Sequence, residues 1–243
     1  MHRPRLRDNK GKKPLELYPL GEIPQNVVWE ISKWMTYYFA IGKADIAGED
    51  WGDIFAKGIK GEHLGRPIGL ADVVLEGMAW SVKSVKMTKP HDRKKARVIS
   101  GRCSPDYSHG IANPHEDIQN TGRAVLSIYN ERINIAKEDY EPLRTIILIR
   151  DFNTLEFTLF EQDTVRYITS EYIWEKNKNG NLEGYHMESN RHCFTWQPHG
   201  SQFTVLYDIP AYACRFKIKR PAVFDVEEAL QQIGFDESWV TIL

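Results

Sequence analysis

Residues 70–86, which read LADVVLEGMAWSVKSVK, bring a carboxylate, a hydroxyl and an amine into a short stretch of chain. Two runs of alternating apolar residues flank Gly77-Met78, a pattern that predicts a β-hairpin with a two-residue turn. In that register Asp72 lies opposite Lys83 and close to Ser81. A structural ion pair would explain the two charges. A lysine-rich stretch follows the hairpin, however, and favours a metal-dependent site.

The other face of the predicted hairpin is apolar. Side chains alternate along a strand, so one face carries only Val73, Leu75, Trp80 and Val82. The same register sets Leu75 opposite Trp80. A second serine-x-lysine, Ser84-Val85-Lys86, would place its lysine on this apolar face. We therefore favour Lys83 as the functional lysine.

The order Asp72, then Ser81-Val82-Lys83, resembles the PD-(D/E)xK nuclease superfamily, which includes many type II restriction endonucleases. In that family an aspartate starts one strand of a hairpin and an acid-x-lysine lies on the next. The resemblance covers about residues 48–90, where a helix, the hairpin and a basic segment follow in the family's order. It implies a restriction-endonuclease-like core, with a central mixed β-sheet flanked by helices. It also implies Mg²⁺-dependent hydrolysis of phosphodiester bonds in double-stranded DNA.

Ser81 stands where the family usually has its second carboxylate. Some restriction endonucleases that cut CCGG-containing sites similarly have serine-x-lysine and take the missing acid from elsewhere. The candidates in this chain are Glu62, Asp53, Glu49 and Glu76. We rank Glu62 first, because it precedes the hairpin by a short connection, and Asp53 second.

The resemblance also implies a role for each residue. Asp72 would bind Mg²⁺ together with Glu62 or Asp53 and the backbone carbonyl of Val82. Lys83 would position the attacking water and stabilise the charge that develops on the phosphate. The Ser81 hydroxyl would hydrogen-bond a metal-bound water.

Charge is distributed unevenly along the chain. Residues 83–102 carry eight Lys or Arg and one acid, and residues 1–13 carry six and one, although the whole chain has a net charge of −1. A basic stripe on an acidic body is typical of polyanion binders, and a solvated loop is the ordinary alternative. The predicted DNA-contacting residues in this stripe are Lys86, Lys89, Arg93, Lys94, Lys95 and Arg97.

A second candidate DNA contact is the segment 191–204, RHCFTWQPHGSQFT. Trp196, Gln197 and His199 are of the types that stack on bases or read base edges. An ordinary β-hairpin loop is the competing interpretation.

The pattern of apolar residues predicts a mixed α/β order of elements. Helices are expected at 25–41, 48–59 and 115–135, and a last one from Asp225, whose spacing to Glu228 fits a capping box. Strands are expected at 70–76, 79–86, 144–150, 155–160, 202–208 and 212–219. Residues 175–190 are predicted to be a long loop. We expect a basic flexible arm over 1–22 and a single domain over 23–243.

Composition bounds the function. The 243 residues contain no apolar run near the length of a membrane span, and the three cysteines indicate reduced thiols in a cytoplasmic protein. No phosphate-binding P-loop and no G-x-S-x-G motif is present. We expect a sequence-specific DNA endonuclease. A homodimer is one possible assembly, because two strands must be cut. The alternatives are a non-catalytic DNA-binding or regulatory protein on the same fold, and a nuclease for RNA or single strands.

Overall fold

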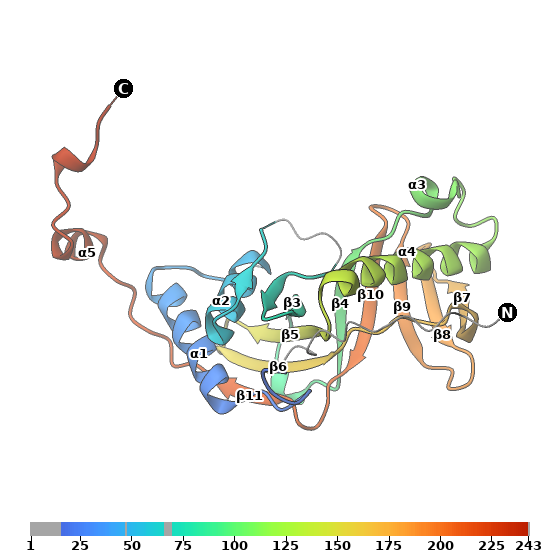
Figure 1. The fold of residues 1–243 in the computed structure, drawn as a ribbon, viewed down its shortest axis with the longest axis horizontal. Helices are drawn as coiled ribbons and strands as arrows, with labels where there is room; N and C mark the ends of the chain where they lie inside the picture. The colour runs from blue at the N-terminus through green and yellow to red at the C-terminus, as the bar shows by residue number, and fades with distance from the viewer. Residues whose placement is uncertain (1–15, 47, 66–69, 243) are drawn as a thin grey trace, which may run out of the picture.

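The computed structural model describes residues 16–46, 48–65 and 70–242, which form a mixed α/β fold with two sheets (Figure 1). The first sheet has the strand order β1-β2-β3-β5-β6-β11 and the second β4-β10-β9-β8-β7. The helices are α1 Gln25–Ala40, α2 Gly48–Ile59, α3 Pro105–His109, α4 Ile118–Asp139 and α5 Val226–Gln232. The strands are β1 Glu62–His63, β2 Val73–Leu75, β3 Met78–Lys86, β4 Lys95–Arg102, β5 Leu143–Asp151, β6 Glu156–Asp163, β7 Tyr172–Lys176, β8 Leu182–His186, β9 His192–Gln197, β10 Gln202–Asp208 and β11 Cys214–Lys217.

The first sheet is mixed because β3 pairs with β5 in parallel, whereas its other pairs are antiparallel. Both faces of β5 are buried. Ile146 and Leu148 face the core formed with α1 and α2, whereas Ile147 and Ile149 face the core shared with α4 and the second sheet. A strand covered on both sides needs a continuous apolar run, which the sequence of β5 supplies.

The predicted central mixed sheet is one of two sheets, and β4, where no strand was expected, belongs to the second. It pairs with β10 from Gln202↔Arg102 to Asp208↔Lys95 and so starts the second sheet. Along β4, Ala96 and Val98 are buried and the intervening residues are exposed. The part of the basic stripe that lies on β4, with Lys95 and Arg97, is therefore the solvent side of a strand with an apolar inner side.

The predicted long loop at 175–190 is also wrong, because it contains parts of β7 and β8. These strands form a hairpin whose turn is held by the Asn177 side chain, which accepts hydrogen bonds from the backbone N–H groups of Asn179 and Asn181. Trp174 of β7 packs on α4 at Gly122, where an added Cβ would lie 2.2 Å from the indole. The polar sequence of the hairpin concealed this buried anchor.

The other predicted elements are confirmed within a few residues. α5 begins where the capping box predicted, since the Asp225 side chain accepts a hydrogen bond from the backbone N–H of Glu228 at 3.0 Å. In the described part of the chain, no helix is both long and apolar enough to cross a lipid bilayer.

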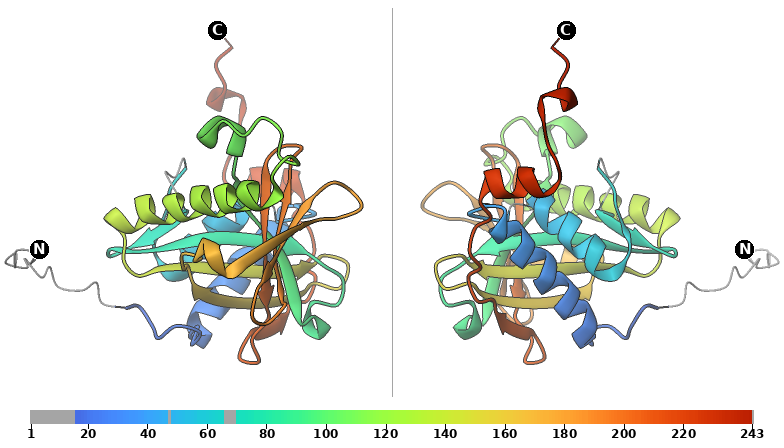
Figure 2. Two further views of the ribbon diagram at one scale, coloured as in Figure 1. Left: turned by 90° about the vertical axis from the view of Figure 1, so that its right-hand side faces the viewer. Right: turned by 90° about the vertical axis from the view of Figure 1, so that its left-hand side faces the viewer.

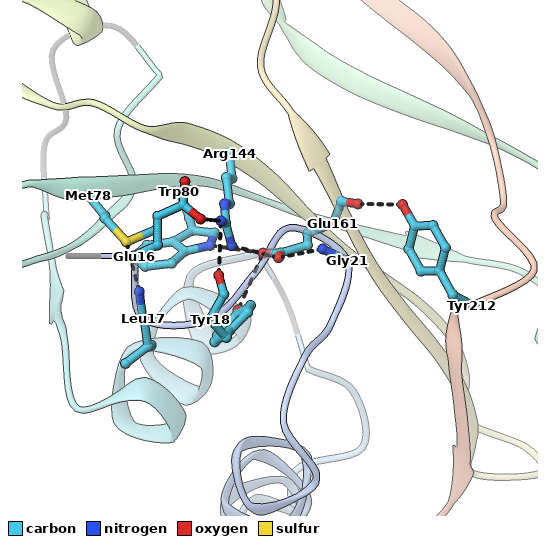
Figure 3. A network of polar contacts seen from close by, with 9 residues as sticks. All are labelled: Glu16, Leu17, Tyr18, Gly21, Met78, Trp80, Arg144, Glu161 and Tyr212. Carbon is cyan, nitrogen blue, oxygen red and sulfur yellow. Dashed lines mark hydrogen bonds and ion pairs between the residues drawn. The ribbon is translucent and has the colours of Figure 1, made fainter. Parts of the chain in front are cut away.

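Most of the predicted flexible arm over 1–22 lies outside the described residues, but its last part is not a free arm. Tyr18 is 5% exposed and joins a buried polar network around Glu161 of β6 and Arg144 of β5 (Figure 3). Arg144 Nη1 donates to Glu161 Oε1 at 2.9 Å, and Gly21 N donates to the same oxygen at 3.1 Å. Tyr18 Oη and Trp80 Nε1 donate to Oε2 at 3.3 and 3.1 Å. The network attaches residues 16–21 to the strand that carries Ser81 and Lys83.

Burial dominates the electrostatics of this network. It raises the pKa of the Glu161 carboxyl, and the Arg144 guanidinium and the three other donors oppose that rise. Burial also raises the pKa of Tyr18, whose hydroxyl stays a donor to Glu161. A fully buried acid accepting four hydrogen bonds holds its neighbours in fixed positions.

Candidate active site

The hairpin that carries the candidate residues turns at Glu76-Gly77, not at the predicted Gly77-Met78. The pairs Val73↔Trp80 and Leu75↔Met78 shift the expected register by two residues. The physical reason is the turn, because both of its central residues have positive φ, 48° and 86°. A shift of two residues preserves which face a side chain is on. Asp72 therefore still lies on the side of Ser81 and Lys83.

Three donors converge on one oxygen of Asp72. Oδ2 accepts from the backbone N–H of Val82 at 2.7 Å, from Lys83 Nζ at 2.9 Å and from Ser81 Oγ at 3.3 Å. The side chains of Asp72 and Lys83 are 21% and 20% exposed. Oδ1 takes part in none of these three contacts. The predicted Asp72–Lys83 ion pair is thus present and half-buried.

The ion pair lies in a cleft of about 480 Å³ between α2, β1 and β3. Glu49 and Asp53 of α2 line the same cleft, as do Val82 and His63. Asp53 Oδ1 lies 2.7 Å from His63 Nδ1. His63 can approach α2 because residue 52 is glycine, where a Cβ would be 2.4 Å from the imidazole Nε2. The cleft therefore places acids from a helix beside the Asp72–Lys83 pair.

Glu62, ranked first as the missing acid, is not among the residues that line the cleft. It is exposed and pairs with Val74 in the β1–β2 ladder, where alternation sends its side chain to the opposite face from His63. Glu76 is a central residue of the hairpin turn and does not line the cleft either. Our ranking is corrected by this geometry, which favours Asp53 or Glu49 over Glu62.

His63 is a residue that the sequence analysis missed. It lies on a strand of only two residues, which is too short for an alternation pattern to reveal. The sequence did carry one indication. His63 is next to Glu62, and only one of two adjacent strand residues can face the cleft.

The side chains of the cleft supply only part of the ligand shell of a hard divalent ion. Within residues 16–46, 48–65 and 70–242, no three His, Cys, Asp or Glu side chains are grouped as metal ligands. Mg²⁺ is usually held by one or two carboxylates and completes its shell with waters and substrate phosphates. Asp72 with Asp53 or Glu49 meets that minimum. The fit rests on the cleft's acids and not on a closed ligand cage.

The turn between β3 and β4 is not brought into this cleft. The backbone N–H of Lys89 donates to Asp151 at the end of β5, and the imidazole Nε2 of His91 lies 3.1 Å from the Phe157 carbonyl and 3.2 Å from that of Phe216. These contacts hold the turn over β5, β6 and β11, on the other side of β3 from β1 and β2. Arg93 and Lys94 follow it and are exposed.

The remaining predicted DNA contacts divide into exposed and buried residues. Lys86, Lys95, Arg97 and His199 are exposed, and Gln197 is half-buried. Arg97 donates to Thr195 Oγ1 at 2.8 Å across the second sheet. The prediction for Trp196 is wrong, because its side chain is 3% exposed and its indole N–H donates to the Cys103 carbonyl at 2.8 Å. Trp196 is a core residue.

Comparison with known proteins gives no relative, since no family model, no curated protein and no solved structure matches this chain. Any assignment of function therefore depends on the residues and the geometry above. The central elements of that geometry are the Asp72–Lys83 pair and the acids of α2.

Proposed function

We propose that this protein is a Mg²⁺-dependent, sequence-specific endonuclease that hydrolyses phosphodiester bonds in double-stranded DNA. One observation carries the proposal: Asp72 and Lys83 meet at 2.9 Å in a cleft that Glu49 and Asp53 also line. A carboxylate to hold a metal, an amine beside it and further acids are what metal-assisted phosphodiester hydrolysis requires. The resemblance of Asp72 and Ser81-Val82-Lys83 to the sequence motif of the PD-(D/E)xK nucleases supports the same assignment.

The proposal gives roles to Ser81 and to several of the residues that line the cleft. Asp72 binds the ion, with Asp53 or Glu49 as the second acid and the Val82 carbonyl as a further ligand. When bound, Mg²⁺ polarises the phosphate and acidifies its bound water. Lys83 donates to the oxygen on which negative charge develops. Ser81 holds Asp72 in place through its hydrogen bond to Oδ2.

The DNA backbone would contact the basic residues outside the cleft. Lys89 lies on the turn over β5, β6 and β11, Lys94 follows that turn, and Lys95 and Arg97 lie on the exposed side of β4. Phosphate contacts of this kind position a duplex and carry no sequence information.

One observation favours the second candidate, a non-catalytic DNA-binding or regulatory protein. Oδ2 of Asp72 is satisfied by three donors of the chain itself, and Ser81 is neutral. A carboxylate that is already paired with Lys83 and hydrogen-bonded within the chain needs no metal to balance its charge. In that case DNA binding is independent of Mg²⁺ and no DNA is cut.

A substrate panel separates these functions. Supercoiled plasmid, single-stranded DNA and RNA are incubated with the protein and Mg²⁺, and in parallel with EDTA. The nuclease proposal expects discrete plasmid fragments with Mg²⁺ alone. Plasmid retarded on a gel but intact in both conditions would support the binding protein, and cleavage of RNA or single strands alone would redirect the substrate assignment.

A further inference from the structure

The chain after β11 leaves the body of the protein. Residues 221–242, which we call the C-terminal arm, extend away from the two sheets and include α5 and a short 3₁₀ turn at Glu237–Trp239 (Figures 1 and 2). Residues 222–242 are exposed except for Leu230, which is half-buried. The arm therefore contributes little to the core of its own chain.

The exposed side chains of the arm are unusually apolar for a solvated segment. They include Val223, Phe224, Val226, Ile233, Phe235, Trp239, Val240 and Ile242, of which Trp239 is 58% exposed. Phe235 and Trp239 contact each other edge to face at 5.7 Å between ring centres. Contiguous exposed apolar surface of this kind marks a site of association. A helix of seven residues is also too short to be stable in water without a surface to pack on.

The arm is also strongly acidic. Residues 221–242 contain five acids, Asp225, Glu227, Glu228, Asp236 and Glu237, and no lysine or arginine. Its binding partner should therefore combine apolar surface with positive charge.

The same chain carries a groove with those properties. A groove of about 450 Å³ lies between α1 and the chain that follows β11, lined by Trp29, Ser32, Lys33, Thr36 and residues 217–219. Trp29 is 72% exposed, and three lysines line the groove with it: Lys33, which pairs with Glu30, Lys217, which pairs with Glu156, and Lys219. We call this the α1–β11 groove.

On its observed path the arm does not lie in the groove of its own chain. The backbone N–H of Phe224 donates to the Ala40 carbonyl at 2.7 Å, and Arg220 Nη2 donates to the Phe152 carbonyl at 2.6 Å. These contacts lead the arm past the C-terminal end of α1. Trp29 lies eleven residues before Ala40, which is about 16 Å back along the helix at 1.5 Å per residue. The arm thus begins beside its own groove, two residues after Lys219, but leaves it along the outside of α1 and points outward (Figure 1).

We propose that the C-terminal arm docks in the α1–β11 groove of a second copy of this chain, so that two copies exchange arms. Both contacts are identical under a two-fold axis, which closes the assembly as a dimer. The acidic residues of each arm face the lysines of the partner's groove, and Phe235 and Trp239 pack against Trp29. The assignment is independent of nuclease activity, because it rests on surface chemistry outside the cleft.

The first test is the mass of the full chain in solution. Sedimentation velocity between about 1 and 100 μM should show a species of twice 28.2 kDa that grows with concentration. A monomer throughout this range would overturn the proposal.

The second test uses two variants with exposed substitution sites. Trp239→Asp damages the arm and Trp29→Asp damages the groove, and each should raise the dimer Kd by about tenfold or more. Tyr107→Asp is the matched control, since Tyr107 is an aromatic residue of α3 that is 93% exposed and lies outside both surfaces. The control should dimerise as the wild type does, and unchanged circular dichroism should show that all three variants fold.

Mixing the two variants tests whether the arm contacts the groove. The Trp239→Asp copy retains a groove and the Trp29→Asp copy retains an arm, so a mixed dimer contains one intact contact. The mixture, followed with one fluorescently labelled copy, should therefore associate more tightly than either variant alone. A mixture no tighter than its components would show that the arm binds another surface and would overturn the proposal.

Discussion

The buried acid Glu161 offers a stability prediction whose size follows from its contacts. Glu161→Gln keeps the shape of the side chain and replaces one acceptor oxygen by an NH₂ group. One orientation of the amide turns NH₂ toward Tyr18 and Trp80, and the other turns it toward Arg144 and Gly21. In the first case Trp80 loses its acceptor and the Tyr18 hydroxyl must accept instead of donate, in the second Arg144 and Gly21 lose theirs, and in both cases the negative charge beside Arg144 is removed.

Each hydrogen bond to a charged group contributes about 1.5–3 kcal/mol, so Glu161→Gln should lower the free energy of unfolding by about 3–5 kcal/mol. For a chain of this length the melting temperature should fall by roughly 6–20 °C. Glu156→Gln on the same strand is the matched control. Its pair with Lys217 at 3.2 Å is exposed and should contribute less than about 1 kcal/mol.

The assay is urea denaturation of the wild type, Glu161→Gln, Arg144→Met and the double variant. Since either single change leaves a buried partner unsatisfied, the two effects should overlap, with a coupling energy of about 1–3 kcal/mol. Additivity within about 0.5 kcal/mol would refute the shared network. So would a Glu161→Gln variant no less stable than Glu156→Gln.

Three further predictions concern the cleft, the basic turn and a buried thiol. Asp53→Asn should abolish plasmid cleavage while Glu62→Gln cuts normally, and the reverse pattern in the cleavage assay would restore Glu62 as the missing acid. Lys89→Ala with Lys94→Ala should weaken binding of every duplex and lower the log–log salt slope by about 0.9 per lost contact, whereas an unchanged slope in filter-binding titrations would show that both lysines are only solvated. Burial raises the pKa of Cys103 to about 12, so at pH 8 only about one thiol in 10⁴ is ionised. Iodoacetamide should therefore label Cys103 only after denaturation. Rapid labelling of Cys103 in the folded protein, located by mass spectrometry, would contradict this.

The sequence was sufficient where one local pattern decides the outcome. The helical spacing in α1 and α2 and the capping box of α5 needed no information from the rest of the chain. The face of the hairpin that carries Asp72 and Lys83 was also predictable, because alternation survives a register shift of two residues. The turn was predicted one residue too late in the sequence, since a glutamate side chain gives no indication that Glu76 adopts a positive φ.

Features that depend on distant partners were not predictable. Trp196 lies among residues typical of a DNA-contacting loop, yet its indole pairs with the carbonyl of Cys103, which is distant in sequence. The acids that line the cleft with Asp72 come from α2, and only the folded cleft distinguishes Asp53 from Glu62. The polar hairpin of β7 and β8 likewise depends on Trp174 packing against α4.

The central claim is that Asp72 and Lys83 perform chemistry, and cleavage of supercoiled plasmid at saturating Mg²⁺ by Asp72→Asn and Lys83→Ala tests it most directly. Asp72→Asn removes the charge that holds a hard ion, and Lys83→Ala removes the group that acts on developing charge, so each should slow cleavage by about 10²–10³-fold or more. Melting temperature and DNA affinity are measured on the same samples. Lys178→Ala and Glu188→Gln, exposed residues of and just after the β7–β8 hairpin, serve as controls and should cut normally. We predict two folded, DNA-binding, inactive variants; two destabilised variants that still cut at the wild-type rate would show that the pair is only a structural ion pair.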